Sequence, residues 1–215
     1  MMSHAIRWRA VHAQLRERLL AARAGQPFWL GRLADSALAT ATAAAALAVG
    51  GSPADRGLID AALRWLTRNQ NADGGWGDTP QSPSNLPATL LTLAAFRLAG
   101  ASPPPDAQAC AERQGGVAAV ARLYGGDRTF SVPILTCCAI AGLADWSAVP
   151  PLPMELAALP RRTFRLLGLP VVSYALPALI AMGLVHLVKR PPRNLLLRWL
   201  RQAVTGRVLR RLEAQ

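Results

Sequence analysis

Apolar and polar positions along this chain follow the period of an α-helix, and the pattern is clearest in residues 58–69. Leu58, Ala62 and Leu66 recur there at helical spacing, whereas Arg64 lies off that face. Further segments of this kind, separated by breaks rich in Gly and Pro, predict more helices. They are residues 1–24, 34–49, 86–98, 108–123, 134–143, 166–188 and 195–212. No segment alternates with a period of two, so we predict an all-α fold.

A turn motif follows the helix that ends near residue 69. Gln70 stands at the end of that helix, Gly74 and Gly75 tolerate positive φ, and Trp76 comes six residues after Gln70. A glutamine side chain at this position can reach backbone donors at a neighbouring helix end and lie across an indole face. We therefore predict that these four residues form a structural clamp between helices. The alternative is a helix that stops at Gly-Gly, followed by a tryptophan in the core.

A second copy of this motif lies nearer the N-terminus. Residues 15–29 resemble residues 63–76, and Trp29 lies 47 positions before Trp76. A weaker third copy begins at residue 113. Each copy leads into a helix of small apolar residues, so the repeating unit comprises two helices. A period in the high forties predicts a protein built from helical-hairpin repeats.

The stretch from Gln70 to Trp76 resembles the glutamine-tryptophan motif of squalene-hopene cyclases and related class II triterpene cyclases. Residues 146–160 read Trp-x-x-Val-Pro, then Pro-x-Glu-Leu and Leu-Pro, and are similar to a stretch of the same family. Residues 128–130 and 172–174 resemble its Arg-x-Phe and Val-Ser-Tyr segments. Prenyltransferase subunits have similar repeats, but they bind zinc through an Asp/Cys/His set for which this sequence offers no candidate.

The resemblance implies a partial α/α barrel, or toroid, of helical hairpins over residues 1–190. Residues 191–215 would then form a basic amphipathic helix that starts the next repeat and stops before its tryptophan. Helical repeats bury their core only against neighbouring repeats. We therefore expect residues 195–215 to project with few long-range contacts.

The resemblance also implies cyclisation of a polyprenyl substrate such as squalene through carbocations, as in hopanoid biosynthesis. Phe130 and Tyr174 match positions where the family places aromatic residues near its substrate, and Ala175 stands where the family usually has a tryptophan. Family members protonate the alkene with an Asp-x-Asp-Asp motif, which these 215 residues lack. We therefore expect cavity lining without a catalytic residue, no activity of the chain alone, and the second barrel domain of a cyclase as its partner.

Composition and charge narrow the kinds of partner and cofactor that the chain is expected to bind. Apolar residues make up 52% of the chain and charged residues 17%, with a net charge of +12. The aromatic residues lie in apolar segments without an interleaved stripe of cations, so we expect no nucleic-acid partner. Cys110, Cys137 and Cys138 lack the spacing of a zinc site, and we expect neither a metal nor a cofactor.

Two segments suggest contact with a membrane. Residues 166–188 are 23 residues without Lys, Arg, Asp or Glu, long enough to span a bilayer, although Pro170 and Pro177 weaken a continuous helix. Residues 195–212 carry apolar side chains at i+4 steps among arginines, as in helices that lie on anionic bilayers. The resemblance favours a peripheral protein on the cytoplasmic side of the cell membrane. The alternatives are a spanning protein and a small membrane-associated repeat protein that binds a prenyl lipid without catalysis.

Overall fold

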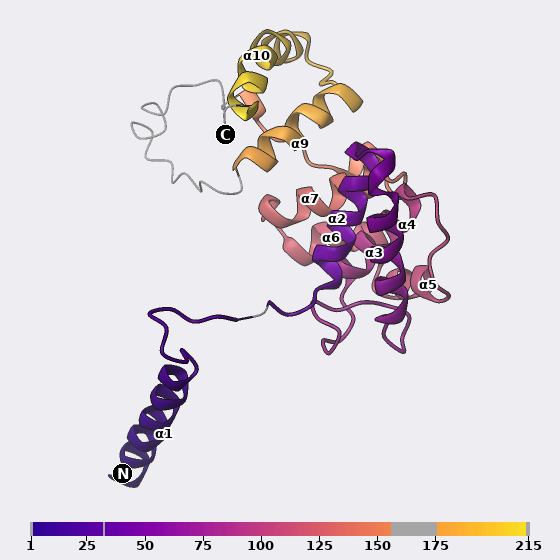
Figure 1. Ribbon diagram of the computed structural model, residues 1–215. Helices are drawn as coiled ribbons and strands as arrows, with labels where there is room; N and C mark the ends of the chain where they lie inside the picture. The colour runs from indigo at the N-terminus through magenta and orange to yellow at the C-terminus, as the bar shows by residue number, and fades with distance from the viewer. Residues whose placement is uncertain (1, 32, 156–175, 214–215) are drawn as a thin grey trace, which may run out of the picture. The chain divides into compact units, whose positions relative to one another are not determined.

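A computed structural model describes residues 2–31, 33–155 and 176–213 of the chain (Figure 1). Every regular element in these ranges is a helix, which confirms the predicted all-α fold. The chain divides into two compact units, Met1–Asp35 and Ser36–Gln215.

The first unit contains α1 (Met2–Ala21) and the segment that follows it. The chain reverses at Ala24 and Gly25, which both have positive φ, and brings Trp29 back to the helix. The Trp29 indole Nε1 donates a hydrogen bond of 2.6 Å to the Leu19 carbonyl oxygen. The Arg23 guanidinium lies 5.3 Å from the centre of the Trp29 ring, so a cation–π contact closes the turn.

The second unit contains eight further α-helices in its described part, joined by short loops and two one-turn 3₁₀ helices. These are α2 (Ala37–Gly50), η1 (Pro53–Asp55), α3 (Arg56–Arg68), α4 (Leu86–Leu98), α5 (Ala107–Arg113), α6 (Gly116–Tyr124), α7 (Arg128–Ile140), η2 (Trp146–Ala148), α9 (Leu176–Lys189) and α10 (Leu195–Glu213). The predicted helical segment 108–123 is divided into α5 and α6 at Gly115 and Gly116, which both have positive φ. Side-chain oxygens of Ser36, Asn85 and Asp127 cap the first turns of α2, α4 and α7.

Helix α4 is the central helix of the second unit. Its residues from Leu86 to Phe96 are all buried, and it packs against α2, α5, α6 and α7. The neighbouring α2 is rich in alanine, and Ala37, Ala41, Ala44 and Ala45 are buried on it. Side chains this small allow the backbone of α2 to approach α4 closely.

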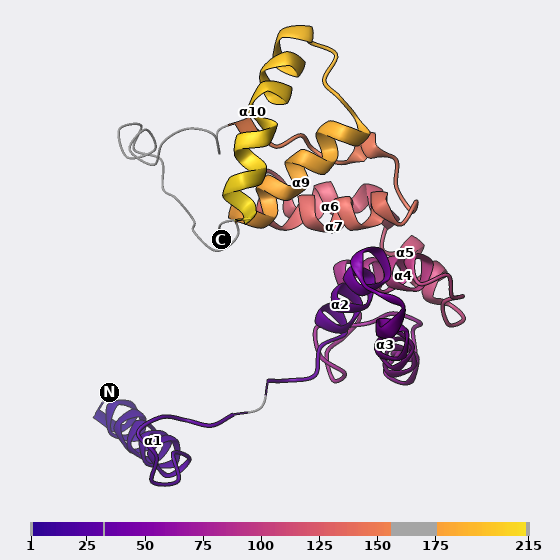
Figure 2. The same cartoon turned by 45° about the horizontal axis from the view of Figure 1, so that its top comes forward.

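Helix α9 lies between α7 and α10 (Figure 2). It covers only part of the predicted helix 166–188, because residues 166–175 lie outside the described ranges. None of the helices in the described ranges combines the length and the apolar character that a membrane crossing needs.

Helix α10, for which we expected few long-range contacts, is attached to the second unit along one side. Val208 and the charged Arg201 are buried, and Arg201 contacts residues of the 152–155 segment. These contacts, with α9 and the 152–155 segment, come from one side of the helix, and most of its other described residues are exposed.

The close packing of α2 predicts a large effect of added volume. Ala41 is fully buried, whereas Ala43 in the same helix is exposed. Ala41→Leu should lower the free energy of unfolding by about 1–3 kcal/mol through overpacking. Ala43→Leu is the matched control and should change it by less than about 0.5 kcal/mol. Urea unfolding measures both, and equal effects would contradict close packing at Ala41.

Candidate functional site

The turn after α3 holds the repeat motif that the sequence indicates. The Gln70 side-chain Nε2 donates hydrogen bonds of 2.8 Å to the carbonyl oxygens of Gly74 and Pro105. The side chain therefore contacts carbonyl acceptors rather than the backbone donors that we expected. It joins the end of α3 to the residues that immediately precede α5.

Trp76 is fully buried at the end of this turn. Its indole Nε1 donates to the Leu66 carbonyl oxygen at 2.8 Å, and its backbone N–H donates to the Thr89 hydroxyl oxygen at 3.2 Å. Its carbonyl oxygen accepts from the Asn85 backbone N–H at 2.9 Å. Trp76 thus connects the last turn of α3 with the first turn of α4.

Two glycines of the turn lie against α5. Gly74 has a φ of +86°, and a Cβ there would lie 2.7 Å from the Asp106 Cβ. A Cβ at Gly75 would lie 2.6 Å from the Cys110 Sγ. Side chains at these positions would push α5 away, so glycine is needed for steric reasons at both.

Asp73 supports the same turn and was not singled out from the sequence. Its Oδ1 accepts hydrogen bonds from the Ser84 hydroxyl at 2.6 Å and from the Gly75 backbone N–H at 3.0 Å. These two bonds, the Ser84 bond first, hold the pKa of the Asp73 carboxyl below its usual value. The Arg113 guanidinium also donates to the Asp73 carbonyl oxygen at 2.6 Å. Asp73 is a charged acceptor that orders the turn.

The first unit repeats part of this geometry. In both copies the indole Nε1 donates to the carbonyl oxygen ten residues earlier, Leu19 for Trp29 and Leu66 for Trp76. Arg23 occupies the position of Gln70, six residues before the tryptophan, and it donates to the Gln26 carbonyl oxygen. Trp29 is 49% exposed, so the two copies share the local turn and differ in burial.

Phe130 lies in the first turn of α7 and is 56% exposed. Its ring stacks on Tyr124, the last residue of α6, with centroids 5.9 Å apart and planes inclined by 20°. Burial raises the pKa of Tyr124, so its phenol stays protonated at neutral pH. Tyr174 and Ala175 lie outside the described residues. The described partner of Phe130 is therefore Tyr124, which faces it across the Gly125–Gly126 turn and was missed in the sequence.

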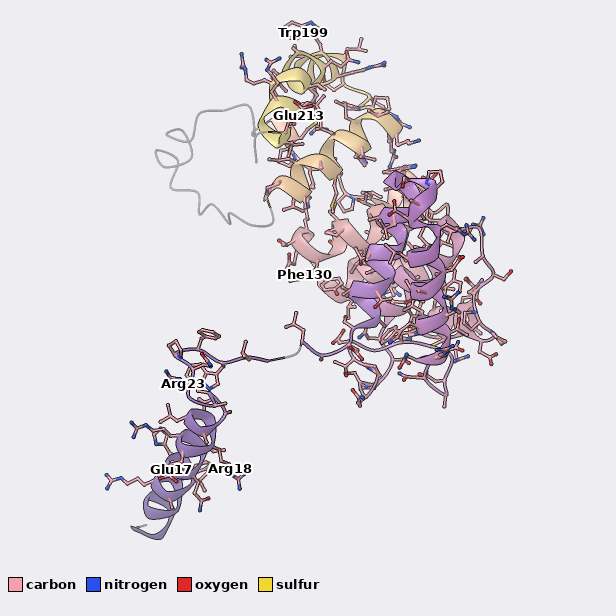
Figure 3. All side chains as sticks on the ribbon, viewed as in Figure 1. Glu17, Arg18, Arg23, Phe130, Trp199 and Glu213 are labelled. Atoms are coloured by element: carbon pink, nitrogen blue, oxygen red, sulfur yellow. The ribbon has the colours of Figure 1, made fainter. Side chains whose placement is uncertain are left out.

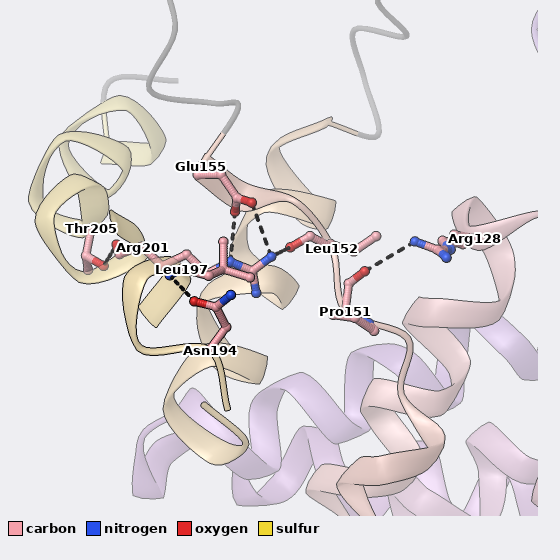
Figure 4. A network of polar contacts seen from close by, with 8 residues as sticks. All are labelled: Arg128, Pro151, Leu152, Glu155, Asn194, Leu197, Arg201 and Thr205. Atoms are coloured by element: carbon pink, nitrogen blue, oxygen red, sulfur yellow. Dashed lines mark hydrogen bonds and ion pairs between the residues drawn. The ribbon is translucent and has the colours of Figure 1, made fainter. Parts of the chain in front are cut away.

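Glu155 belongs to the segment that resembles the cyclase family, and it binds Arg201 of α10 (Figure 4). The Arg201 Nε donates to the Glu155 Oε2 at 2.9 Å, and the Nη2 donates to the Glu155 Oε1 and the Leu152 carbonyl oxygen, both at 3.3 Å. Arg128 Nη1 donates to the Pro151 carbonyl oxygen at 3.4 Å. The 151–155 segment is thereby held from both α7 and α10.

His186 of α9 is buried beside the same segment. Its ring meets Trp146 edge-on, with centroids 6.4 Å apart. No hydrogen bond of ordinary geometry from the described residues reaches either ring nitrogen. Burial lowers the pKa of His186, the nearby Arg190 and Arg201 charges lower it further, and the Val149 backbone opposes this in part. The imidazole is neutral at pH 7.

Burial keeps two cysteine thiols of α7 protonated. Burial raises the pKa of the Cys137 thiol, and burial together with Cys137 raises that of Cys138 to about 12. In the described part of the chain, no three His, Cys, Asp or Glu side chains are placed to hold a metal ion. Open cavities are present in the described part of the second unit. One of about 480 Å³ includes Ser84, Gln114 and Arg122, and one of about 620 Å³ lies between α9 and α10.

Comparison with known proteins assigns the chain to a family. The chain matches the squalene-hopene cyclase N-terminal domain over residues 13–193. It belongs to this family. It is 37% identical over 128 residues to enfumafungin synthase of Hormonema carpetanum, a match that covers 57% of this chain and 9% of the relative. It is 38% identical over 107 residues to a terpene cyclase–glycosyl transferase fusion protein of Humicola fuscoatra, covering 47% and 7%. No solved structure matches the chain significantly.

The geometry of Gln70 predicts a modest structural role. Gln70→Ala removes two hydrogen bonds, a partly buried one to Gly74 and an exposed one to Pro105, and should lower the free energy of unfolding by about 1 kcal/mol. Gln108→Ala removes one exposed hydrogen bond to Glu112 within α5 and serves as the control, with a change near zero. Thermal unfolding of both variants measures this. An unchanged stability of Gln70→Ala would show that the two bonds do not hold the helices together.

His186 predicts a pH dependence of stability. Its folded-state pKa lies below the usual 6.5, so its contribution is complete above that value and is lost as the pH falls below it. His186→Phe should make the decline in unfolding free energy between pH 7.5 and about pH 5.5 shallower, because the variant cannot bind the proton. His12→Gln, at an exposed position of α1, should leave the decline unchanged. Equal slopes for His186→Phe and the parent protein in urea unfolding would refute the assignment.

Proposed function

We propose that this chain forms part of the wall of a polyprenyl-binding cavity in a class II terpene cyclase. The substrate class is a squalene-like polyene and the chemistry is carbocationic cyclisation of the hopanoid type, with the protein held peripherally at the cytoplasmic face of the cell membrane. The proton donor of that reaction and the second barrel domain come from the rest of a cyclase. The family match over residues 13–193 supports the enzyme class.

The Tyr124–Phe130 pair, in which Phe130 is exposed and Tyr124 is half-buried, carries the proposal. Its rings are stacked at the α6–α7 junction, and the ring of Phe130, which belongs to the segment that matches the Arg-x-Phe motif of the family, is accessible. The face of an aromatic ring attracts a cation through its quadrupole, so an aromatic pair can stabilise positive charge without a carboxylate. Neutral Tyr124 and Phe130 therefore suit a surface past which a carbocation forms.

A second candidate function is the binding of a prenyl lipid without catalysis. The cavity of about 620 Å³ favours it, because Leu184, Val188 and Leu209 contribute apolar lining between α9 and α10. A binder of this kind needs an apolar groove and no cation-stabilising surface.

Phe130→Leu distinguishes the two functions. The variant should bind an ammonium analogue of a squalene carbocation about twofold to fivefold more weakly, because it loses the cation–π contact, and should bind neutral squalene as before. Ile140→Ala, at a partly exposed position of the same helix, is the control. Fluorescence competition with a conjugated polyene measures both ligands. Equal losses for the charged and the neutral ligand would support the non-catalytic binder.

A further inference from the structure

The outward side of α10 carries large apolar residues at one end and arginines at the other. We define the α10 outer face as Leu195, Leu196, Trp199, Arg207 and Arg210. Leu195, Leu196 and Trp199 are 76%, 74% and 65% exposed, and Trp199 points away from α9 (Figure 3). At 100° per residue, Arg207 and Arg210 return to the same side of the helix as Trp199. At 1.5 Å per residue, Arg207 follows Trp199 about 12 Å further along the axis.

The opposite side of α10 is fixed to the second unit. Val208 is fully buried, and the buried Arg201 guanidinium is paired with both Glu155 carboxylate oxygens. Removing one partner of such a pair leaves an uncompensated charge, so the helix cannot easily rotate about its axis. The α10 outer face is therefore presented to the surroundings.

The region around α10 is strongly cationic. Between Lys189 and Glu213 the chain has eight cationic residues and a single carboxylate, that of Glu213. The cations are Lys189, Arg190, Arg193, Arg198, Arg201, Arg207, Arg210 and Arg211. Glu155 neutralises only Arg201. An occupant of the α10 outer face must therefore be apolar where it meets Trp199 and anionic where it meets Arg207 and Arg210.

We propose that the α10 outer face docks on the surface of an anionic lipid bilayer. Leu195, Leu196 and Trp199 enter the boundary between headgroups and acyl chains, and Arg207 and Arg210 contact lipid phosphates. The spacing of about 12 Å between the two ends suits a helix that enters obliquely, since interfacial helices bury their apolar side about 5–10 Å deep. Tryptophan favours this depth because its ring is amphipathic. The inference rests on the proposed peripheral membrane association and names the surface and the lipid charge responsible.

The test compares flotation of the full chain with vesicles of phosphatidylcholine alone and with added phosphatidylglycerol. The parent protein should bind the anionic vesicles far more tightly. R207Q/R210Q should weaken this binding roughly thirtyfold, because each arginine near an anionic surface contributes about a fivefold effect. L195A/L196A should weaken it about tenfold. Brominated phosphatidylcholine in the anionic vesicles should quench fluorescence of the parent, and W199F should lose most of that quenching.

Matched controls come from α3 in the same unit. R64Q/R68Q makes the same change of charge at two exposed positions, and Leu58→Ala removes an exposed leucine. Both should bind anionic vesicles like the parent protein. Circular dichroism checks that every variant keeps its helices.

Three outcomes would overturn the inference. If R207Q/R210Q and L195A/L196A bind like the parent, another surface binds the membrane and only the assignment to α10 is wrong. If the parent binds neither vesicle but still prefers the ammonium analogue, the cavity proposal stands without membrane docking. If the parent binds no vesicle and forms an oligomer that L195A/L196A dissociates, the occupant of the outer face is a second copy of the chain.

Discussion

The fold of the second unit depends on one buried hydrogen bond, which the Trp76 indole N–H donates to the Leu66 carbonyl oxygen. The Trp76 indole is fully buried, and an unsatisfied N–H there would cost about 1–3 kcal/mol. The last-turn carbonyls of α3 lack a full set of intrahelical partners, and the Leu66 oxygen accepts the indole N–H at 2.8 Å. Because the Trp76 backbone also bonds Thr89 and Asn85, this one residue sets how α3 leads into α4.

The same turn also determines where α5 lies. Gln70 binds the Pro105 carbonyl oxygen, and Arg113 binds the Asp73 carbonyl oxygen from the other end of α5. Gly74 and Gly75 allow this contact because a Cβ at either would overlap α5. Once α3, α4 and α5 are joined in this way, the alanine-rich α2 can pack closely on the central α4. The repeat is therefore a unit of polar turn contacts that position apolar inner helices.

The sequence predicts the helices and the repeat because both are local. Helical periodicity and the breaks at Gly or Pro depend on neighbouring residues. The hydrogen bonds that the Trp29 and Trp76 indoles donate to carbonyl oxygens ten residues earlier also lie within each motif. The contacts that the sequence did not reveal are long-range. Glu155 and Arg201 are 46 residues apart, and nothing in the local pattern identifies them as partners. Tyr124 and Phe130 are close in sequence, yet their stacking depends on the turn at Gly125 and Gly126.

The pKa shifts of two described carboxyl groups bear on whether these groups could donate a proton. A carboxyl group that protonates an alkene must carry its proton at rest, in a dry site, before it can release that proton to carbon. Asp73 and Asp145 show the reverse, since hydrogen bonds from Ser84 and Ser147 lower the pKa of each carboxyl. Both therefore remain ionised and act as acceptors for turns. Asp73 and Asp145 therefore stabilise the backbone of their own turns, by accepting hydrogen bonds from the Gly75 and Ser147 backbone N–H groups, rather than holding a transferable proton.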